Sequence, residues 1–454
     1  MALETINPAT EKIIKSFNAI SNQEVSEIID KVNKDFLNWK NFNYSKRKHL
    51  LLKAANILRN EKNKYAKILT MEMGKPITQA IAEVEKCAWV IEYYAKNTES
   101  ILKEEIIKTD ASESYVRFEP IGIVLAVMPW NFPFWQVFRF AAPALMAGNA
   151  AILKHASNVP MSALAIEEIF QKAGLPENLF RTLLITSNQV EKVIENPLVK
   201  AATLTGSEYA GSMVASKSGK LLKKSVMELG GSDPFIILED ADLDLSTTVA
   251  VSARLFNNGQ SCIAAKRFIV VEEIYDKFEK LFLEKMKAVV IGDPMKEETE
   301  LGPIARKDLL LELHGQVVKS VEKGATILLG GNILEQKGFY YPATILTNVK
   351  KGMPAYEQEI FGPVASVIKV KDEKEAIFVA NDTDFGLGAS LWTEDINKAK
   401  EIIPSIEAGS VFVNGMVKSD PRLPFGGIKL SGFGRELSHY GIKEFVNIKT
   451  VWIK

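Results

Sequence analysis

The sequence is poor in the residues that build disulfide frameworks, metal centres and histidine-based active sites. Its 454 residues include two cysteines, Cys87 and Cys262, and four histidines. Two cysteines cannot form a disulfide scaffold, so we expect a reducing compartment. The chain contains no HExxH motif, no Cys/His cluster and no GxxxxGK(S/T) motif. This argues against a metal site and against a P-loop.

An excess of one charge and long apolar runs are also missing. Lysine plus arginine and aspartate plus glutamate number 56 each, so the composition favours neither nucleic acid nor an anionic membrane as a partner. The longest clean apolar run, IGIVLAVMP, is far shorter than the roughly 20 residues that span a bilayer. The N-terminal stretch MALETINPATEKII has no signal-peptide layout. We therefore expect a cytoplasmic protein that acts on a small molecule.

The chain is long enough for at least two hydrophobic cores, and its patterning predicts two α/β domains. Residues 24–105 read mostly as helix. Strands and helices then alternate, and the pattern restarts after Gly230-Gly231, which predicts parallel sheets. The predicted strands are 121–128, 150–154, 183–186, 201–205, 225–229, 234–238, 268–271, 325–328 and 364–370, and the helices are 135–147, 162–173, 275–287 and 373–381. The alternating C-terminal segment 447–453 is a further strand, which we expect to pair in another subunit.

Cys262 is the first candidate for chemistry. The helix before it places Leu245, Val249, Ala253 and Phe256 on one face and breaks at Asn257-Asn258-Gly259. The cysteine therefore lies on a tight loop, where the backbone can approach a ligand closely. A buried structural thiol fits that position as well as a nucleophile does. A nucleophile needs a base or an oxyanion site, and no histidine stands in a recognisable hydrolase context.

Three motifs at predicted strand ends, where such sheets bind ligands, supply further candidates. Glu228 precedes two glycines in MELGGSDP, Asn131 lies in PWNFP, and TGSEYAG at 205–211 opens a helix. A carboxylate can act as a base, an amide can donate a hydrogen bond, and a helix N-terminus can bind phosphate. Taken singly, each motif is better explained as a solvated or salt-bridged glutamate, a turn-forming asparagine and an ordinary helix start.

In combination these motifs carry a resemblance. The order PWNFP, TGS, ELGG, GQSC, EIFGPV, PFGGIKLSGFGRE resembles the NAD(P)-dependent aldehyde dehydrogenase superfamily over essentially the whole chain. Glu228 and Cys262 are 34 residues apart, a spacing typical of that family. The stretches LKHASNVP, ELGGSDPF and SGFGRELSHYG look most like its short succinate-semialdehyde dehydrogenase branch. The resemblance implies an aldehyde dehydrogenase-like fold. Because the chain starts at INPAT, we expect it to lack the N-terminal strands that many relatives carry.

The resemblance implies NAD(P)-dependent oxidation of an aldehyde to a carboxylic acid, with succinate semialdehyde giving succinate. Cys262 would attack the aldehyde to form a thiohemiacetal and then a thioester. The Asn131 amide and the Cys262 backbone N–H would hold the oxyanion, and Glu228 would activate the hydrolytic water.

For the cofactor, NADP and/or NAD, the family pattern maps onto a set of residues along the same crevice. Lys154 would lie near the adenosine ribose, Gly206 and Ser207 near the pyrophosphate, Glu359 at the nicotinamide ribose, and Phe361 and Trp130 at the nicotinamide end. Relatives that prefer NAD often carry Glu where this chain has Ser157. A glutamate there would repel a 2′-phosphate by up to roughly 4 kcal/mol at about 4 Å and an effective dielectric of 20. We therefore expect NADP to be accepted, with NAD also used.

For the substrate, Arg139 matches the arginine that binds the distal carboxylate in succinate-semialdehyde dehydrogenases. The family's second arginine is absent, and Phe256 stands in its place. Ser419 and Arg422 fall in the family's substrate loop, and Arg422 is a candidate for the missing charge.

The resemblance also divides the chain. It implies a dinucleotide-binding domain at 1–100 and 121–230, a catalytic domain at 231–420, and an oligomerisation region at 101–120 and 436–454 that makes a homodimer or homotetramer.

Several alternatives stay open. One is an aldehyde dehydrogenase of other specificity, for medium aliphatic or aromatic aldehydes. An enzyme that passes the thioester to coenzyme A is disfavoured, because such enzymes usually lack the glutamate at the position of Glu228. A cysteine hydrolase and a non-catalytic protein on this fold are more distant alternatives.

Overall fold

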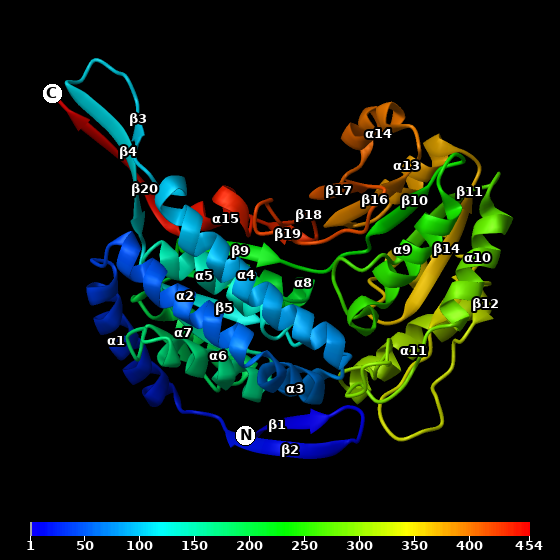
Figure 1. Ribbon diagram of the computed structural model, residues 1–454, viewed down its shortest axis with the longest axis horizontal. Helices are drawn as coiled ribbons and strands as arrows, with labels where there is room; N and C mark the ends of the chain where they lie inside the picture. Colours follow the sequence, from blue (N-terminus) through cyan, green and yellow to red (C-terminus); the bar gives the residue numbers. More distant parts are fainter. Residues whose placement is uncertain (1) are drawn as a thin grey trace.

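Two sheets with separate hydrophobic cores make up the body of the protein, which the computed structural model describes over residues 2–454. Figure 1 shows the two sheets side by side, with an N-terminal hairpin along one edge and a narrow arm that projects away from the body and ends at the C-terminus. The arrangement confirms the predicted two-sheet α/β fold. No helix within the described residues is long and apolar enough to cross a membrane.

The first sheet has six strands in the order β19-β9-β8-β5-β6-β7, and all neighbours except β19 and β9 run parallel. Its strands are β5 (Ile123–Met128), β6 (Ala150–His155), β7 (Phe180–Thr182), β8 (Val199–Thr205), β9 (Lys224–Glu228) and β19 (Gly432–Phe433). The predicted strand 183–186 is wrong. Pairing with β6 ends at Thr182, and the apolar Leu183 and Ile185 are buried in a connection that packs on the core.

The predicted N-terminal helical region is confirmed in type and contains four helices. These helices pack on the first sheet together with the helices that connect its strands. The helices are α1 (Asn22–Trp39), α2 (Tyr44–Asn60), α3 (Lys62–Met73), α4 (Ile77–Ile101), α5 (Trp135–Met146), α6 (Pro160–Lys172), α7 (Val190–Glu195) and α8 (Glu208–Lys220). The long helix α4 packs against α2, α3 and α5. It therefore borders the turn between β5 and α5.

The second sheet has seven strands in the order β12-β13-β14-β11-β10-β16-β17. Its strands are β10 (Pro234–Ile237), β11 (Arg267–Val271), β12 (Thr326–Leu329), β13 (Thr344–Thr347), β14 (Val364–Val370), β16 (Gly388–Trp392) and β17 (Ser410–Val413). Its helices are α9 (Leu243–Leu255), α10 (Tyr275–Lys287), α11 (Lys307–Glu322), α12 (Pro354–Glu357), α13 (Glu373–Asn381) and α14 (Ile396–Ile402). The predicted apolar face of α9 is wrong in part. Leu245 is 48% exposed, and Phe256 lies beyond the helix end at Leu255.

Both ends of the chain form strands. Against expectation, the N-terminus carries a hairpin of β1 (Ala2–Asn7) and β2 (Lys12–Asn18), with Ala2 opposite Asn18. The C-terminal strand β20 (Val446–Ile453) pairs with β4 (Glu113–Pro120) of the same chain, which also pairs with β3 (Glu105–Ile106). The strand therefore has a partner within its own chain and forms the outer strand of the sheet β20-β4-β3, and the expectation that it also pairs in another subunit stays a prediction. Its partner lies more than 300 residues away in the sequence, which is why no neighbour was apparent. Three short elements complete the fold: β15 (Phe385–Gly386), β18 (Ile428–Lys429) and α15 (Ser438–Lys443).

A buried ion pair fixes the turn that leads into α5. Glu83 on α4 pairs with Lys75, and both side chains are almost fully buried. The same carboxylate accepts hydrogen bonds from the backbone N–H groups of Phe134 and Trp135, each at 2.9 Å. No side chain of its own caps the start of α5. Glu83 thus satisfies donors that every helix start leaves free, and it places α5 relative to α4.

We expect Glu83→Gln to lower the free energy of unfolding by about 3 kcal/mol, because it leaves the Lys75 ammonium buried without its counter-ion. Denaturant unfolding measures this change. The matched control is Glu85→Gln on the same helix. It breaks an exposed pair with Lys62 and should cost at most about 1 kcal/mol. Equal effects of the two variants would contradict a structural role for the buried pair.

Candidate functional site

Cys262 lies where two cavities meet. The larger cavity, of about 590 Å³, opens at the carboxyl ends of β5, β8 and β9 and is closed on the other side by α11 and the 357–361 segment. The smaller cavity, of about 100 Å³, lies between α4, α5 and the loops around Cys262 and Ser419. Cys262 lines both cavities. A ligand in one cavity can therefore meet a ligand in the other at this sulfur.

Two buried asparagines hold the loop that carries Cys262. Asn257 and Asn258, directly after α9, adopt left-handed backbone conformations with φ of 57° and 58°. Asn257 Nδ2 donates to the carbonyl oxygens of Asn131 and Gln260, each at 2.9 Å. Asn258 Nδ2 donates to two carbonyl oxygens as well, including that of Gly74 at 2.9 Å. These hydrogen bonds connect the loop to the turn after β5 and to the end of α3. They also hold the strained backbone conformation in place.

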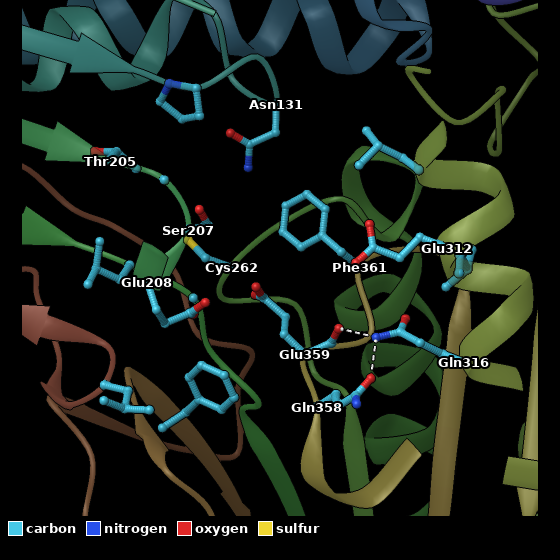
Figure 2. Close-up of a pocket in the computed structure, with 18 of the residues that line it drawn as sticks. Asn131, Thr205, Ser207, Glu208, Cys262, Glu312, Gln316, Gln358, Glu359 and Phe361 are labelled. Atoms are coloured by element: carbon cyan, nitrogen blue, oxygen red, sulfur yellow. Dashed lines mark hydrogen bonds between the residues drawn. The ribbon is translucent and has the colours of Figure 1, made fainter. Parts of the chain in front are cut away.

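Asn131 lies in the turn after β5 and is 3% exposed. Its Nδ2 donates to the carbonyl oxygen of Gln260 at 3.1 Å. An amide nitrogen has two N–H groups, so one remains for a ligand. In Figure 2 this amide points into the larger cavity. The turn is braced by His155, whose Nε2 lies 2.8 Å from the carbonyl oxygen of Pro133. Burial lowers the pKa of His155 to about 4, so this histidine is neutral.

The thiol of Cys262 is protonated near neutral pH. Burial raises its pKa to about 12, and the positive charges of Lys266 and Arg139 oppose that rise. Lys266 is itself buried and donates to the carbonyl oxygen of Cys262 at 2.7 Å. It also lies 3.4 Å from a carboxylate oxygen of Glu359. Lys266 was not among the site residues predicted from the sequence, although it lies only four residues after Cys262.

The two glycines after Glu228 make room for neighbours. A Cβ at Gly231 would lie 2.7 Å from the carbonyl oxygen of Cys262, and one at Gly230 would lie 2.8 Å from Glu359 Oε2 and still closer to Glu208. Gly231 N–H also donates to Glu359 Oε1 at 3.0 Å. A side chain at either position would push the Cys262 loop or the carboxylates away.

Glu228 is buried and does not line either cavity. Its carboxylate lies against Gly426, where a Cβ would come within 2.7 Å of Oε1. Neither carboxylate oxygen has a hydrogen-bond partner among the described residues. Burial and the nearby Glu436 carboxylate raise the pKa of Glu228 well above its usual range, against the lowering effect of Arg139. Glu436 forms an ion pair with Arg139. The role of Glu436 was not predicted, although the motif SGFGRE contains it.

The structure brings most of the predicted cofactor residues together. Gly206, Ser207, Glu359, Phe361 and Trp130 all line the larger cavity. Trp130 and Phe361 meet edge to face, with ring centroids 5.7 Å apart. Ser207 caps the N-terminus of α8 by accepting a hydrogen bond from Ala210 N–H at 3.4 Å. Figure 2 shows Gln316, which was not predicted, holding the 358–359 segment through hydrogen bonds of 3.1 and 3.2 Å.

Two predicted cofactor residues lie outside this cavity. Lys154 is the penultimate residue of β6, beside β5, and Ser157 lies in the exposed loop that follows. Burial lowers the pKa of Lys154, and its ammonium group forms no ion pair with any residue of 2–454.

The structure places two of the three predicted substrate residues at the smaller cavity. Arg139 and Ser419 line the smaller cavity with Cys262, and Phe256 forms part of its apolar wall. Arg422 does not reach this cavity. Its side chain is 68% exposed and paired with Asp420 at 2.6 Å. Lys86 also lines the cavity, and it was missed because a lysine on a long helix gives no sequence signal. Among residues 2–454, no three His, Cys, Asp or Glu side chains are arranged to hold a metal ion.

Known proteins share this architecture. A profile of the aldehyde dehydrogenase family matches residues 1–451. A probable NADP(+)-dependent succinate-semialdehyde dehydrogenase of Synechocystis sp. is 53% identical over 453 residues and covers 100% of both chains. A succinate-semialdehyde dehydrogenase (NADP(+)) of Mycobacterium tuberculosis is 48% identical and also covers 100% of both. The crystal structure of succinic semialdehyde dehydrogenase from Streptococcus pyogenes in complex with NADP+ superposes with a TM-score of 0.97 at 40% identity, over 99% of each chain.

Proposed function

Because the chain belongs to the aldehyde dehydrogenase family, we propose that it oxidises succinate semialdehyde to succinate with NADP, and also with NAD. The observation that carries the proposal is the position of Cys262 between two cavities. The larger one suits a dinucleotide, and the smaller one suits a short aldehyde. The names of the full-length relatives support the substrate and the cofactor.

In the first step, the thiol releases its proton to water and the Cys262 sulfur bonds to the aldehyde carbon, while the C=O electron pair moves to the oxygen. The free N–H of the Asn131 amide and the Cys262 backbone N–H hold the resulting oxyanion. Fixed donors of this kind stabilise charge as it develops. Lys266 favours the thiolate through its buried positive charge. A bound cofactor would supply the hydride acceptor, and loss of the hydride from the former aldehyde carbon would leave a thioester on Cys262.

Glu228 is the base that activates water to hydrolyse this thioester. The carboxylate lies away from both cavities, so its side chain must rotate toward Cys262 before it acts. A raised pKa makes this carboxylate a stronger base than an exposed glutamate. The presence of Glu228 also favours hydrolysis over transfer to coenzyme A.

The residues around the larger cavity fit NADP. The N-terminus of α8 offers free N–H groups to the pyrophosphate beside Gly206 and Ser207. Glu359 would hold the nicotinamide ribose, and Phe361 and Trp130 would flank the nicotinamide. Lys154, which has no partner carboxylate within residues 2–454, and the uncharged Ser157 would accommodate a 2′-phosphate.

The domains and the assembly follow from the same assignment. The dinucleotide-binding domain takes residues 1–100 and 121–230, and the catalytic domain takes 231–420. The arm at 101–120 and 436–454 joins subunits into a homodimer or homotetramer, and Ile106, Ile448 and Trp452 leave apolar surface exposed on it. A reducing compartment such as the cytoplasm keeps Cys262 as a thiol.

A panel of aldehydes tests the function. We expect the purified protein to reduce NADP with succinate semialdehyde at a kcat/KM roughly one to two decades above that for butyraldehyde, since a charge-assisted hydrogen bond contributes about 1.5–3 kcal/mol. Absorbance of the reduced nicotinamide is the measurement, and coenzyme A should not be required. A better rate with butyraldehyde or an aromatic aldehyde would instead favour another aldehyde specificity.

The division of labour between Cys262 and Glu228 predicts two different defects. Cys262→Ala should abolish oxidation, whereas Glu228→Gln should give a burst of about one reduced cofactor per site followed by slow turnover. Rapid-mixing absorbance separates the two phases. Cys87→Ala, which removes the other cysteine, a buried residue that lines neither cavity, should keep its turnover. Normal steady-state rates in either site variant would rule out this assignment.

Cofactor choice should respond to charge at position 157. Ser157→Glu should lower the ratio of kcat/KM for NADP over NAD by about tenfold or more, because a carboxylate would repel the 2′-phosphate. Ser157→Gln has the same length without the charge and should keep most of the wild-type ratio. The idea fails if the two variants behave alike, or if the wild type rejects NADP.

A further inference from the structure

The smaller cavity contains two cations, and one of them already has a partner. Arg139 forms a buried ion pair with Glu436, donates to Thr205 Oγ1 at 3.4 Å and stacks on Phe425 with 4.6 Å between guanidinium and ring centroid. A substrate carboxylate at Arg139 would also meet the neighbouring anion of Glu436. Arg139 alone is therefore a weak source of net positive charge in this cavity.

Lys86 is the second cation, and no carboxylate neutralises it. It lies on α4 one turn beyond Glu83 and is half-buried. Its Nζ donates to Ser419 Oγ at 2.8 Å and lies 4.2 Å from the centroid of the Trp135 ring. Within residues 2–454 its ammonium group has no carboxylate oxygen inside ion-pair distance. The rest of the wall includes the aromatic rings of Phe132, Phe256 and Phe425, and also Glu83, whose carboxylate pairs with Lys75.

We propose that Lys86, together with Ser419, binds the carboxylate of the aldehyde substrate at the end of the cavity away from Cys262. This inference rests on the proposed function, since it names the residue that recognises the charged end of succinate semialdehyde. Ser419 Oγ and Lys86 Nζ are 2.8 Å apart, so both can donate to one carboxylate. The aromatic wall leaves the chain between carboxylate and aldehyde in an apolar environment.

The surroundings of Lys86 make its charge sensitive to pH. Burial, together with the charge of Arg139 on α5, lowers its pKa to about 8. Glu83 and Cys87 on α4 and Asp420 on the loop after Ser419 act in the opposite direction. Lys86 is therefore a cation below pH 8 and loses its proton as the pH rises through that value.

The experiment compares kcat/KM for succinate semialdehyde and butyraldehyde between pH 6.5 and 9.5 in the wild type, Lys86→Met and Lys86→Arg. Their ratio cancels the titration of Cys262 and Glu228, and kcat/KM reports the free enzyme. We expect the wild-type ratio to fall as the pH rises through about 8. Lys86→Met should lower the ratio about tenfold or more at pH 7 and make it independent of pH. Lys86→Arg should keep the preference up to pH 9.5, because arginine stays protonated.

The control is Lys96→Met, which removes an exposed lysine from the same helix and should leave the ratio unchanged. Butyraldehyde kcat/KM and the thermal midpoint show whether each variant is folded, and the Lys86→Arg profile tests the idea independently of Lys86→Met. If Lys86→Met keeps the wild-type ratio, or Lys86→Arg follows the wild-type pH profile, the role of Lys86 is overturned while the proposed function stands. If the wild type itself shows no preference for succinate semialdehyde, the proposed function fails and the role of Lys86 fails with it.

Discussion

The buried ion pair between Arg139 and Glu436 joins the helix that follows the β5 turn to the segment before α15. Loss of either partner would leave a charge buried without its counter-ion, at a cost of about 3–5 kcal/mol. The pair also determines the electrostatics nearby. The Glu436 carboxylate raises the pKa of Glu228, and it neutralises the positive charge of Arg139. Both the proposed base and the proposed substrate cavity therefore depend on this one interaction.

Close backbone approach is the second constraint on the site. The Cys262 carbonyl lies where a Cβ of residue 231 would stand, and the backbone of Gly362 lies where a Cβ of Gly259 would stand. Two consecutive left-handed asparagines bring the loop to this position, at a cost of about 1 kcal/mol or more each. Their buried amide hydrogen bonds offset that strain. The sulfur is thus placed by a loop that has little room to relax, as a preorganised nucleophile requires.

Local signals predicted much of this arrangement. The alternation of apolar strands and helices predicted the two sheets, and the motifs around Asn131, Gly206 and Cys262 predicted residues that now line one cavity. The local sequence patterns failed where a feature depends on contacts between distant segments of the chain. The partner of β20 lies more than 300 residues earlier in the sequence, and no local pattern predicts it. Lys86 reads as a solvated helix lysine until α4 packs against α5. Arg422 was predicted as a substrate residue together with Ser419, but its side chain is exposed and pairs with Asp420.

A lysine is proposed at an anionic group of each ligand, at a distance from Cys262. Lys154, which lies outside the larger cavity, is proposed for the 2′-phosphate of the cofactor, and Lys86, in the smaller cavity, is proposed for the substrate carboxylate. A second guanidinium beside Arg139 would hold its charge permanently in a cavity of about 100 Å³, and the two would repel each other. A lysine avoids that cost, because burial lowers its pKa and allows it to lose its proton. An incoming carboxylate stabilises the charged form of Lys86 and raises its pKa, so the cavity gains its full positive charge when the substrate is present. The recognition of the substrate's charged end and the protonation of Lys86 are therefore one coupled equilibrium.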